Sequence, residues 1–305
     1  MGDARKGLAI SGGGAYGAYA GGILQYLIDD KGNDYDLVVG TSTGALIAPL
    51  AAMNKIDLLK RAYTNVTNED IYNVNPFVIE NGKVKSIKTW NAIWRILQGK
   101  ESLGETKRLR ETIENFLPEK IYRQLQETEK QVLVAVTNLN KQRVEYKANY
   151  LNGREDFMDW MWASACVPVF MSLVEKDGAD YVDGGLVDHN PIHLLFERSC
   201  KSIDAIMLRP KMKVPNFSQN KNILNVIMHS IGTMVHEISQ DDAEIAELMA
   251  LKYDVEINFY YMPEELTSNS FVFNKKEMTQ WWEHGYQIAS TEKKGVKRFI
   301  AGKVD

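Results

Sequence analysis

Residues 35–53 read YDLVVGTSTGALIAPLAAM and contain the clearest structural signal in this chain. The apolar run from Tyr35 to Val39 predicts a buried strand, and the residues after Gly44 predict a helix that continues to about Met53. Between them lies Gly40-Thr41-Ser42-Thr43-Gly44, a G-x-S-x-G sequence. At such a turn the glycines allow a sharp bend, and the serine hydroxyl projects beside the free N–H groups of a helix N-terminus. This favours a nucleophilic serine, although a polar turn that only caps the helix has the same composition.

A second strand–turn–helix unit lies nearer the start of the chain. Residues 8–10 are apolar, residues 12–17 read GGGAYG, and the sequence up to Ile28 predicts a helix. The glycine run matches the G-x-G-x-x-G pattern of dinucleotide-binding loops. That function expects an acidic residue near the end of the next strand, where this chain has the serine turn. We therefore expect the N–H groups of Gly13 and Gly14 to face an oxyanion formed at Ser42, the alternative being a tight turn without a ligand.

The rest of the chain continues the alternation of strands and helices. Residues 56–129 are predicted to be mostly helical, and 143–148 to form an edge strand. Further strands are expected at 132–136, 181–182, 203–208 and 255–261, and further helices at 157–164, 220–252 and 275–290. This order predicts an α/β fold with a mainly parallel sheet covered by helices on both faces.

The pattern shows no repeat and no linker, so we expect one domain over residues 1–305. Its parts are a motif-bearing core at 7–210, a helical insertion at about 56–129 and C-terminal helices and a strand at 220–305.

The composition is that of an ordinary globular protein, with 45% apolar and 25% charged residues. A net charge of −4 argues against a nucleic-acid partner. The two cysteines, Cys166 and Cys200, indicate neither a disulfide scaffold nor a cysteine metal site, and no metal or cofactor is expected. No segment has the length of a membrane span or of a secretory signal, so a cytoplasmic location is expected.

A third motif is Asp183-Gly184-Gly185, which is followed by Asn190-Pro191. The glycines let a carboxylate approach another backbone closely, and the 141 residues after Ser42 are enough for the fold to bring the aspartate back to the serine. Taken alone, Asp-Gly-Gly is only a turn signal.

In this order, the glycine loop 12–17, the turn 40–44 and Asp183-Gly184-Gly185 resemble the motifs of the patatin-like phospholipase family. Residues 163–170 (ASACVPVF) and Asn190-Pro191 add weaker support, and the resemblance covers residues 7 to about 210. It implies a three-layer α/β/α fold and phospholipase A or lysophospholipase activity on a lipid ester. The residues that it implies are Ser42 as nucleophile, Asp183 as base, Gly12, Gly13 and Gly14 as the oxyanion hole, and Gly17, Gly40, Gly44, Gly184 and Gly185 as motif glycines.

One position departs from the family pattern. The glycine loop of the family usually contains a basic residue, and here that place is Tyr16. Because backbone donors survive such a change, it affects anion binding and head-group preference rather than the Ser42–Asp183 pair.

A catalytic serine–aspartate pair requires surroundings that raise the pKa of the aspartate. An exposed aspartate has a pKa near 3.9 and is a weak base at neutral pH, so Asp183 needs a dry pocket that raises its pKa. The rival is a Ser–Asp–His triad, because five histidines follow Ser42 in the chain: His189, His193, His229, His236 and His284. Only about two predicted strands precede Ser42, fewer than in an α/β-hydrolase, so we expect each histidine to lie at the surface or behind the site.

Residues 82–110 combine eight Lys or Arg with two Glu, and place Trp90, Ile93, Trp94, Ile96 and Leu97 at helical spacing. Such a helix is suited to peripheral contact with an anionic lipid surface, but the simpler interpretation is that its tryptophans pack on the core. The apolar stretch 223–238 and Trp281-Trp282 are better suited to the core or to a homo-oligomer face.

Three other functions stay open at this level. Within enzymes, the chain is also compatible with an acyltransferase or an esterase of small esters. In another class, the glycine loop alone would suit a nucleotide- or effector-binding module.

Overall fold

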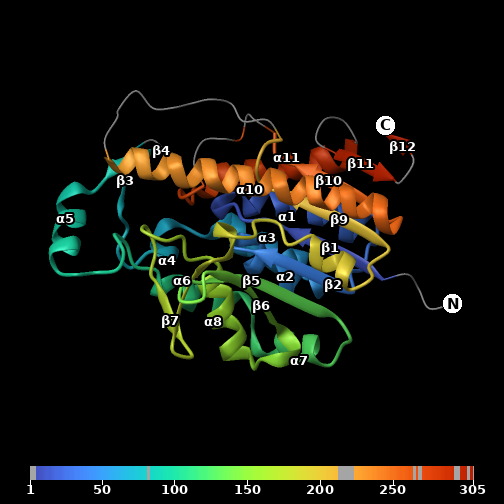
Figure 1. Cartoon of the computed structure of the whole chain (residues 1–305), viewed down its shortest axis with the longest axis horizontal. Helices are drawn as coiled ribbons and strands as arrows, with labels where there is room; N and C mark the ends of the chain where they lie inside the picture. The colour runs from blue at the N-terminus through green and yellow to red at the C-terminus, as the bar shows by residue number, and fades with distance from the viewer. Residues whose placement is uncertain are drawn as a thin grey trace.

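The computed structural model describes residues 5–80, 83–211, 223–263, 266, 270–291, 296–300 and 303–304. These residues form a ten-stranded sheet with helices on both faces, which confirms the predicted α/β fold (Figure 1). The strand order is β12-β11-β10-β9-β1-β2-β5-β8-β7, with β6 paired to β5.

The centre of the sheet is parallel and its margins are antiparallel. The parallel strands are β10 (Glu256–Tyr261), β9 (Ser202–Met207), β1 (Lys6–Ile10), β2 (Leu37–Thr41) and β5 (Gln131–Asn138). The antiparallel strands are β11 (Val296–Ile300), β12 (Lys303–Val304), β6 (Arg143–Ala148), β8 (Ala179–Asp183) and β7 (Val174–Lys176). Parallel strands end at the same edge, so the loops after β1, β2 and β9 lie beside one another.

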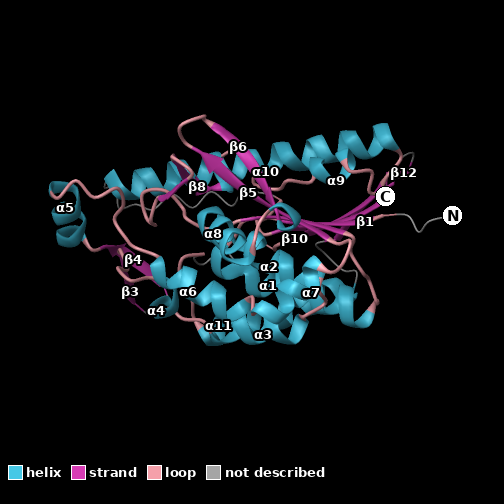
Figure 2. Ribbon diagram, turned by 90° about the horizontal axis from the view of Figure 1, so that it is seen from below, coloured by secondary structure: helices cyan, strands magenta, loops and turns pink. Residues whose placement is uncertain are grey.

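Figure 2 shows the two helical layers on either side of the sheet. One layer holds α9 (His193–Glu197) and the long α10 (Ile223–Tyr253). The other holds α1 (Gly17–Leu24), α2 (Thr43–Ala52), α3 (Ile56–Asn65), α8 (Arg154–Ser164) and α11 (Lys275–Thr291), and α1 is flanked by the short helices η1 (Gly14–Tyr16) and η2 (Gln25–Asp30). Each face of the sheet has its own hydrophobic core, and successive residues of β1 point to opposite faces. Leu8 and Ile10 therefore belong to one core and Ala9 to the other.

Residues 56–129 contain a hairpin that the sequence analysis did not anticipate. The helices α4 (Asn68–Ile71), α5 (Thr89–Leu97), α6 (Lys107–Phe116) and α7 (Glu119–Gln126) agree with the helical expectation, whereas β3 (Phe77–Glu80) and β4 (Lys83–Ile87) pair antiparallel. The cause is visible in the sequence, where β-branched residues flank Asn81-Gly82, a common hairpin signal.

Helix α5 extends away from the rest of the molecule at one end (Figures 1 and 2). The expectation that its tryptophans pack on the core is wrong. Trp90 is 79% exposed and Trp94 is 62% exposed, whereas Ala92 is the buried residue of the helix. The helix therefore presents its apolar side to solvent. No helix in the described ranges combines the length and hydropathy needed to cross a bilayer.

Helices α1 and α11 pack closely because glycines lie at their contact. Trp282 of α11 is fully buried, and its Nε1 donates to Gln25 Oε1 over 2.7 Å, so the expectation that Trp281-Trp282 belongs to the core or to a dimer face is resolved in favour of the core. A Cβ atom on Gly22 would lie 1.9 Å from the Trp282 carbonyl oxygen.

We therefore predict that Gly22→Ala destabilises the fold by about 2 kcal/mol or more, because the added methyl group forces the two helices apart. Gly232→Ala is the matched control, since no atom lies within 4 Å of a Cβ at that position of α10 and alanine favours helix. Urea unfolding followed by circular dichroism measures both variants. Equal stability of Gly22→Ala and wild type would contradict the packing described here.

Candidate active site

The turn between β2 and α2 presents Ser42 in a strained conformation. Its φ of 55° and ψ of −121° lie in a region that side-chain-bearing residues rarely adopt. Two flanking glycines make this turn possible by close approach. A Cβ on Gly40 would lie 2.4 Å from Gly44, and a Cβ on Gly44 would lie 2.0 Å from the Ile10 carbonyl oxygen. The sharp turn expected at residues 40–44 therefore lies between β2 and α2, and both of its glycines make close contacts.

The backbone around Ser42 is held by side chains from distant elements. The Ser42 N–H donates to the hydroxyl of Ser164 at the end of α8, over 2.9 Å. The hydroxyl of Thr41 donates to the carbonyl oxygen of Asp188 over 3.1 Å, and the hydroxyls of Thr43 and Tyr63 form a hydrogen bond. These contacts stabilise the strained turn on three sides. Ser164 belongs to the stretch 163–170 that the sequence analysis noted.

The glycine loop after β1 lies next to the serine turn. A Cβ on Gly12 would lie 3.2 Å from Ser42 Cβ, and one on Gly17 would lie 2.5 Å from Thr43 Oγ1. Gly14 has a φ of 54°, and a Cβ there would clash with the Ser270 carbonyl oxygen at 2.2 Å. No acceptor for the N–H groups of Gly13 and Gly14 is found within the described residues. These donors are available at the same edge of the sheet as Ser42.

The register across β5 brings Asp183 to the same level. Thr41 of β2 pairs with Ala135 of β5, and the next residue of β5, Val136, pairs with Asp183 at the end of β8. Gly184 then passes the β5 backbone closely, since a Cβ there would lie 2.4 Å from the Ala135 carbonyl oxygen. Ser42 and Asp183, far apart in sequence, thus become neighbours through one shared strand.

The Asp183 carboxylate is buried and hydrogen-bonded. It accepts the Gly185 N–H over 2.8 Å and a hydrogen bond from the Ser42 side chain. Burial raises the pKa of Asp183 to about 6, although the hydrogen bonds from Ser42 and Gly185 and the charge of Arg209 act in the opposite direction. A carboxyl with this pKa is ionised at neutral pH and is a stronger base than an exposed aspartate.

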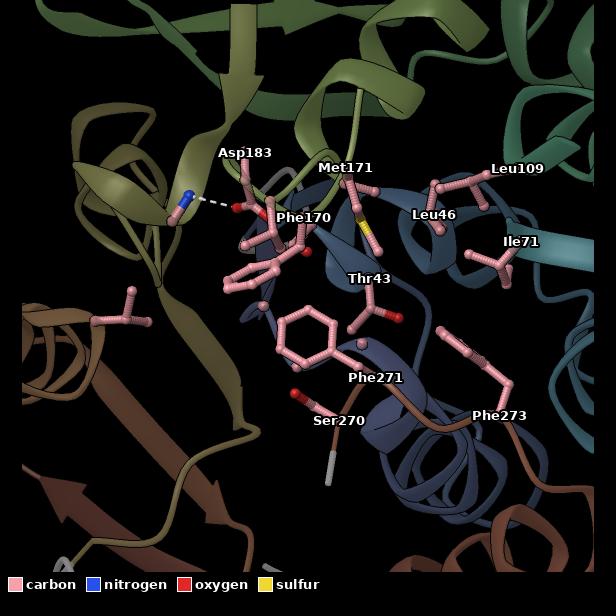
Figure 3. A pocket seen from close by; sticks show the side chains of 18 of the residues that line it. Thr43, Leu46, Ile71, Leu109, Phe170, Met171, Asp183, Ser270, Phe271 and Phe273 are labelled. Carbon is pink, nitrogen blue, oxygen red and sulfur yellow. Dashed lines mark hydrogen bonds between the residues drawn. The ribbon is translucent and has the colours of Figure 1, made fainter. Parts of the chain in front are cut away.

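A cavity of about 210 Å³ opens beside these groups. Figure 3 shows Asp183 at one end of it, and Ile71, Leu109 and Phe273 toward the other. The residues between are mainly apolar and come from several elements, including Leu46, Phe170, Met171 and Phe271, and α10 adds Met228, Ile231 and Val235. The stretch 223–238, predicted to serve a core or a dimer face, thus contributes to the cavity wall. The site joins the hydroxyl of Ser42 and the carboxylate of Asp183 to an apolar chamber.

Two polar residues of the cavity were missed by sequence reasoning. Arg209 lies two residues after the end of β9, and His189 lies between Asp183 and Asn190 in the chain. The signal for Arg209 was its place at the carboxyl end of a predicted strand, where the motif residues also stand. The expectation that each histidine lies at the surface or behind the site is wrong for His189, which is 3% exposed and lines the cavity.

His193 and His284 are not among the residues that line the cavity. His193 contacts the hydroxyl of Tyr146, and the ring of His284 packs edge-on against Tyr19. Ser42 hydrogen-bonds the aspartate directly, which is not the arrangement of a Ser–Asp–His triad.

A metal or dinucleotide is not suggested by this geometry. Within the described residues, no group of three or more His, Cys, Asp or Glu side chains is placed to bind a metal ion. The second parallel strand ends in Thr41 and Ser42, where a dinucleotide site would have an acidic residue.

Comparisons with known proteins give the following results. No curated protein matches the chain. Among solved structures, the crystal structure of VipD from Legionella pneumophila shares 15% identity with a TM-score of 0.44, covering 98% of this chain and 68% of that one. The model of the family described as patatin-like phospholipase matches residues 8–196, more than half of the sequence. The chain therefore belongs to the patatin-like phospholipase family, whose members hydrolyse lipid esters.

Proposed function

We propose that this protein is a phospholipase A or lysophospholipase that uses Ser42 and Asp183 as a catalytic dyad. The observation that carries the proposal is the hydrogen bond from the Ser42 hydroxyl to a buried carboxylate of raised pKa at the end of an apolar cavity. A nucleophile and a base in direct contact are the minimum for acyl transfer through a covalent intermediate.

The reaction follows in two balanced steps. Ser42 Oγ attacks the ester carbonyl as Asp183 takes its proton, and the tetrahedral intermediate collapses to an acyl-serine while that proton passes to the departing alcohol. Water then attacks the acyl-serine, Asp183 accepts a proton from it, and the fatty acid leaves as the proton returns to Ser42 Oγ. Each step uses the same carboxylate, first as base and then as acid.

The oxyanion of both intermediates needs donors, and the glycine loop supports that role. Gly12, Gly13 and Gly14 all line the cavity, and Gly12 lies next to Ser42. Backbone N–H groups held in a rigid loop stabilise developing negative charge without reorganising. The close contacts at Gly14 and Gly17 keep this loop fixed.

The apolar length of the cavity favours an acyl chain over a small acid. Side chains such as Phe170, Met171 and Phe273 offer contacts that a short ester would leave unused. An acyltransferase would use the same first step with an alcohol in place of water. Product analysis with and without an added alcohol separates the two reactions.

We predict that an alkyl fluorophosphonate labels wild type and not Ser42→Ala. Phospholipid vesicles incubated with wild type should yield free fatty acid and lysolipid, detected by mass spectrometry, and Ser42→Ala should yield neither. Ser230→Ala, at an exposed position of α10, is the control and should behave as wild type. Labelling of Ser42→Ala at the wild-type rate would rule out Ser42 as the nucleophile.

Asp183→Asn is predicted to lose turnover by about a thousandfold or more, because the base is removed, and yet to gain stability. The folded-state pKa of Asp183 is raised from 3.8 to about 6, so the folded protein binds this proton more tightly than the unfolded chain. The contribution of this carboxyl group to the stability of the folded protein is therefore present below pH 4 and is lost as the pH rises to about 6. Above pH 6, Asp183→Asn should be more stable than wild type by up to about 3 kcal/mol.

Urea unfolding at pH 4 and at pH 8 measures this difference. The exposed Asp177→Asn, in the turn before β8, is the control and should show no difference between the two pH values relative to wild type. If Asp183→Asn is no more stable than wild type at pH 8, the carboxylate is not destabilised by burial.

We further propose that α5 contacts the surface of an anionic phospholipid bilayer. Its exposed face carries Trp90, Ile93, Trp94 and Leu97 at the spacing of one helical side. Indole rings and aliphatic chains of such a face bury themselves in the headgroup region of a membrane.

Charge around α5 supports an anionic surface, although less than the bare count of cations suggested. Lys85, Arg95 and Arg110 are already paired with carboxylates, of Glu80, Glu105 and of Glu155 and Asp159. Lys88 and Lys100, one at each end of α5, are exposed and have no ion pair among the described residues. A lysine at each end of an exposed apolar face is suited to lipid phosphate and carboxylate groups.

The segments before and after α5 in the sequence contact residues of the cavity wall. The Leu103 N–H donates to the Val169 carbonyl oxygen over 2.7 Å, next to Phe170 of the cavity wall. Phe77 precedes α5 in the sequence, and its ring lies 5.6 Å from that of Phe170 and 5.2 Å from that of Phe271. A membrane bound by α5 would thus lie close to the wall of the lipid-binding chamber.

The double variant Trp90→Ala/Trp94→Ala should bind mixed phosphatidylcholine–phosphatidylserine vesicles at least about tenfold more weakly, because two large apolar groups are lost from the contact. Its kcat/KM on a monomeric short-chain ester should equal that of wild type. Leu151→Ala/Leu248→Ala removes two exposed apolar side chains elsewhere and is the control. Vesicle sedimentation gives the affinities, and unchanged binding of the tryptophan variant would exclude α5 as the contact.

A further inference from the structure

The polar end of the cavity contains buried nitrogen atoms with no hydrogen-bond partner. Among the described residues, both ring nitrogens of His189 and Nε of Arg209 lack one. Leaving such groups unpaired disfavours the folded state. All three atoms belong to residues that line the cavity with Ser42 and Asp183. Unmet hydrogen bonding concentrated at one end of an apolar chamber indicates a polar ligand there.

Arg209 is fixed beside the glycine loop by the sheet. The Ser11 N–H donates to the Ile206 carbonyl oxygen over 3.0 Å, and the Leu208 N–H donates to Ser11 Oγ over 2.7 Å. These bonds hold the residues before Arg209 against the start of the glycine loop. The guanidinium charge acts on Asp183 on one side and on Tyr16 of the loop on the other.

His189 lines the same space, and the charge of Arg209 acts on its ring. Its Nδ1 would lie 3.2 Å from a Cβ on Gly12, the same distance that separates this Cβ from Ser42 Cβ, so Nδ1 and Ser42 Cβ are less than 6.4 Å apart. Its backbone N–H donates to Asp242 Oδ2 of α10 over 3.0 Å, as does the Asn190 N–H over 2.8 Å. The loop that carries the ring is thus held in place from behind, and on the cavity side the Gly12 backbone lies close enough to act on the pKa of His189 as a hydrogen-bond partner.

The charges of Arg209 and His189 determine which kind of ligand they can bind. Burial and the nearby charge of Arg209 lower the pKa of His189 to about 3, so the ring is neutral and offers one N–H donor. Arg209 contributes one positive charge with planar N–H donors, which suit the oxygens of an oxyacid. One cation and one neutral donor match the oxygens of an anionic phosphate group.

We propose that Arg209 and His189 form a subsite for a phosphate group on the alcohol half of the substrate, so that the enzyme prefers phosphate-bearing lipid esters to uncharged ones. This rests on the proposed dyad. When the carbonyl is at Ser42 and the acyl chain extends toward Ile71 and Phe273, the alcohol half must lie at the polar end of the cavity. Arg209 and His189 are side-chain donors at that end, in addition to the N–H groups of the glycine loop.

The test compares two substrates with the same acyl chain, a monoacyl glycerophosphate and a monoacylglycerol, both as monomers. Arg209→Met should lower kcat/KM for the phosphate substrate about 30- to 100-fold more than for the uncharged substrate, the difference typical of a hydrogen bond to a charged group. The loss on the uncharged substrate measures the effect of the missing charge on Asp183. Arg209→Lys should restore part of the activity on the phosphate substrate. His189→Asn should show the same selectivity with a loss of about tenfold.

Inorganic phosphate gives a readout on the wild-type enzyme that needs no variant. It should inhibit hydrolysis of the monoacylglycerol competitively, and this inhibition should disappear in Arg209→Met.

Two results would overturn the subsite. Equal losses of kcat/KM on both substrates in Arg209→Met would show that the arginine acts through Asp183 rather than on the substrate. The subsite would also be overturned if wild type hydrolysed both substrates without a preference for the phosphate substrate and without phosphate inhibition. That result would leave the dyad intact. Failure of the dyad itself is distinguishable, because wild type would then hydrolyse neither substrate.

Discussion

The contact between Ser42 and Asp183 depends on a carboxylate that is kept away from water. Burial disfavours its charged form, whereas two hydrogen bonds and the Arg209 cation favour it, and the pKa settles at about 6. Burial alone would raise the pKa further and favour the protonated form, whereas an exposed carboxylate would be a weaker base. Much of the surrounding architecture sets this balance: the cavity wall excludes water, Gly185 offers its N–H, and β9 delivers Arg209.

Geometry of this kind requires backbones to pass closer than side chains permit. The motif glycines are needed because Gly44 lies against the Ile10 carbonyl, Gly184 against the Ala135 carbonyl, and Gly12 between Ser42 and His189. Each pair joins two strands or loops at the same edge of the sheet. The parallel order β9-β1-β2-β5 places Arg209, the glycine loop and Ser42 side by side at one edge of the sheet. The antiparallel β8 ends at the level of Ser42 because of its register on β5.

These relations explain which parts could be predicted. The strand–turn–helix around Ser42, the glycine loop and the parallel sheet follow from local patterns of apolar residues and glycines. The pairing of Ser42 with Asp183 was implied by the resemblance of three ordered motifs to the patatin-like phospholipase family, since no local pattern contains a contact across 141 residues. His189 and Arg209 were missed because a lone histidine or arginine acquires a role only through long-range neighbours.

The tryptophans of α5 illustrate a different limit. An amphipathic pattern states that one side of a helix is apolar, but not what covers that side. Trp90 and Trp94 have the spacing of core residues, and only the position of α5 beyond the body of the molecule shows that no part of the described chain covers them. The opposite outcome at Trp282, which is buried between α1 and α11, came from the same kind of sequence signal.

The site gathers groups that lower stability, and the fold compensates for them nearby. Ser42 has a positive φ, Asp183 is buried, and His189 leaves its ring unpaired among the described residues. Asp242 of α10 braces the loop behind them by accepting two backbone N–H groups, although burial and the charge of Asp188 raise its own pKa to about 7. A ligand that paired the open nitrogens would remove part of this cost. Unfavourable features that meet at one point, each held by an unrelated element, are best understood as belonging to one function rather than to folding.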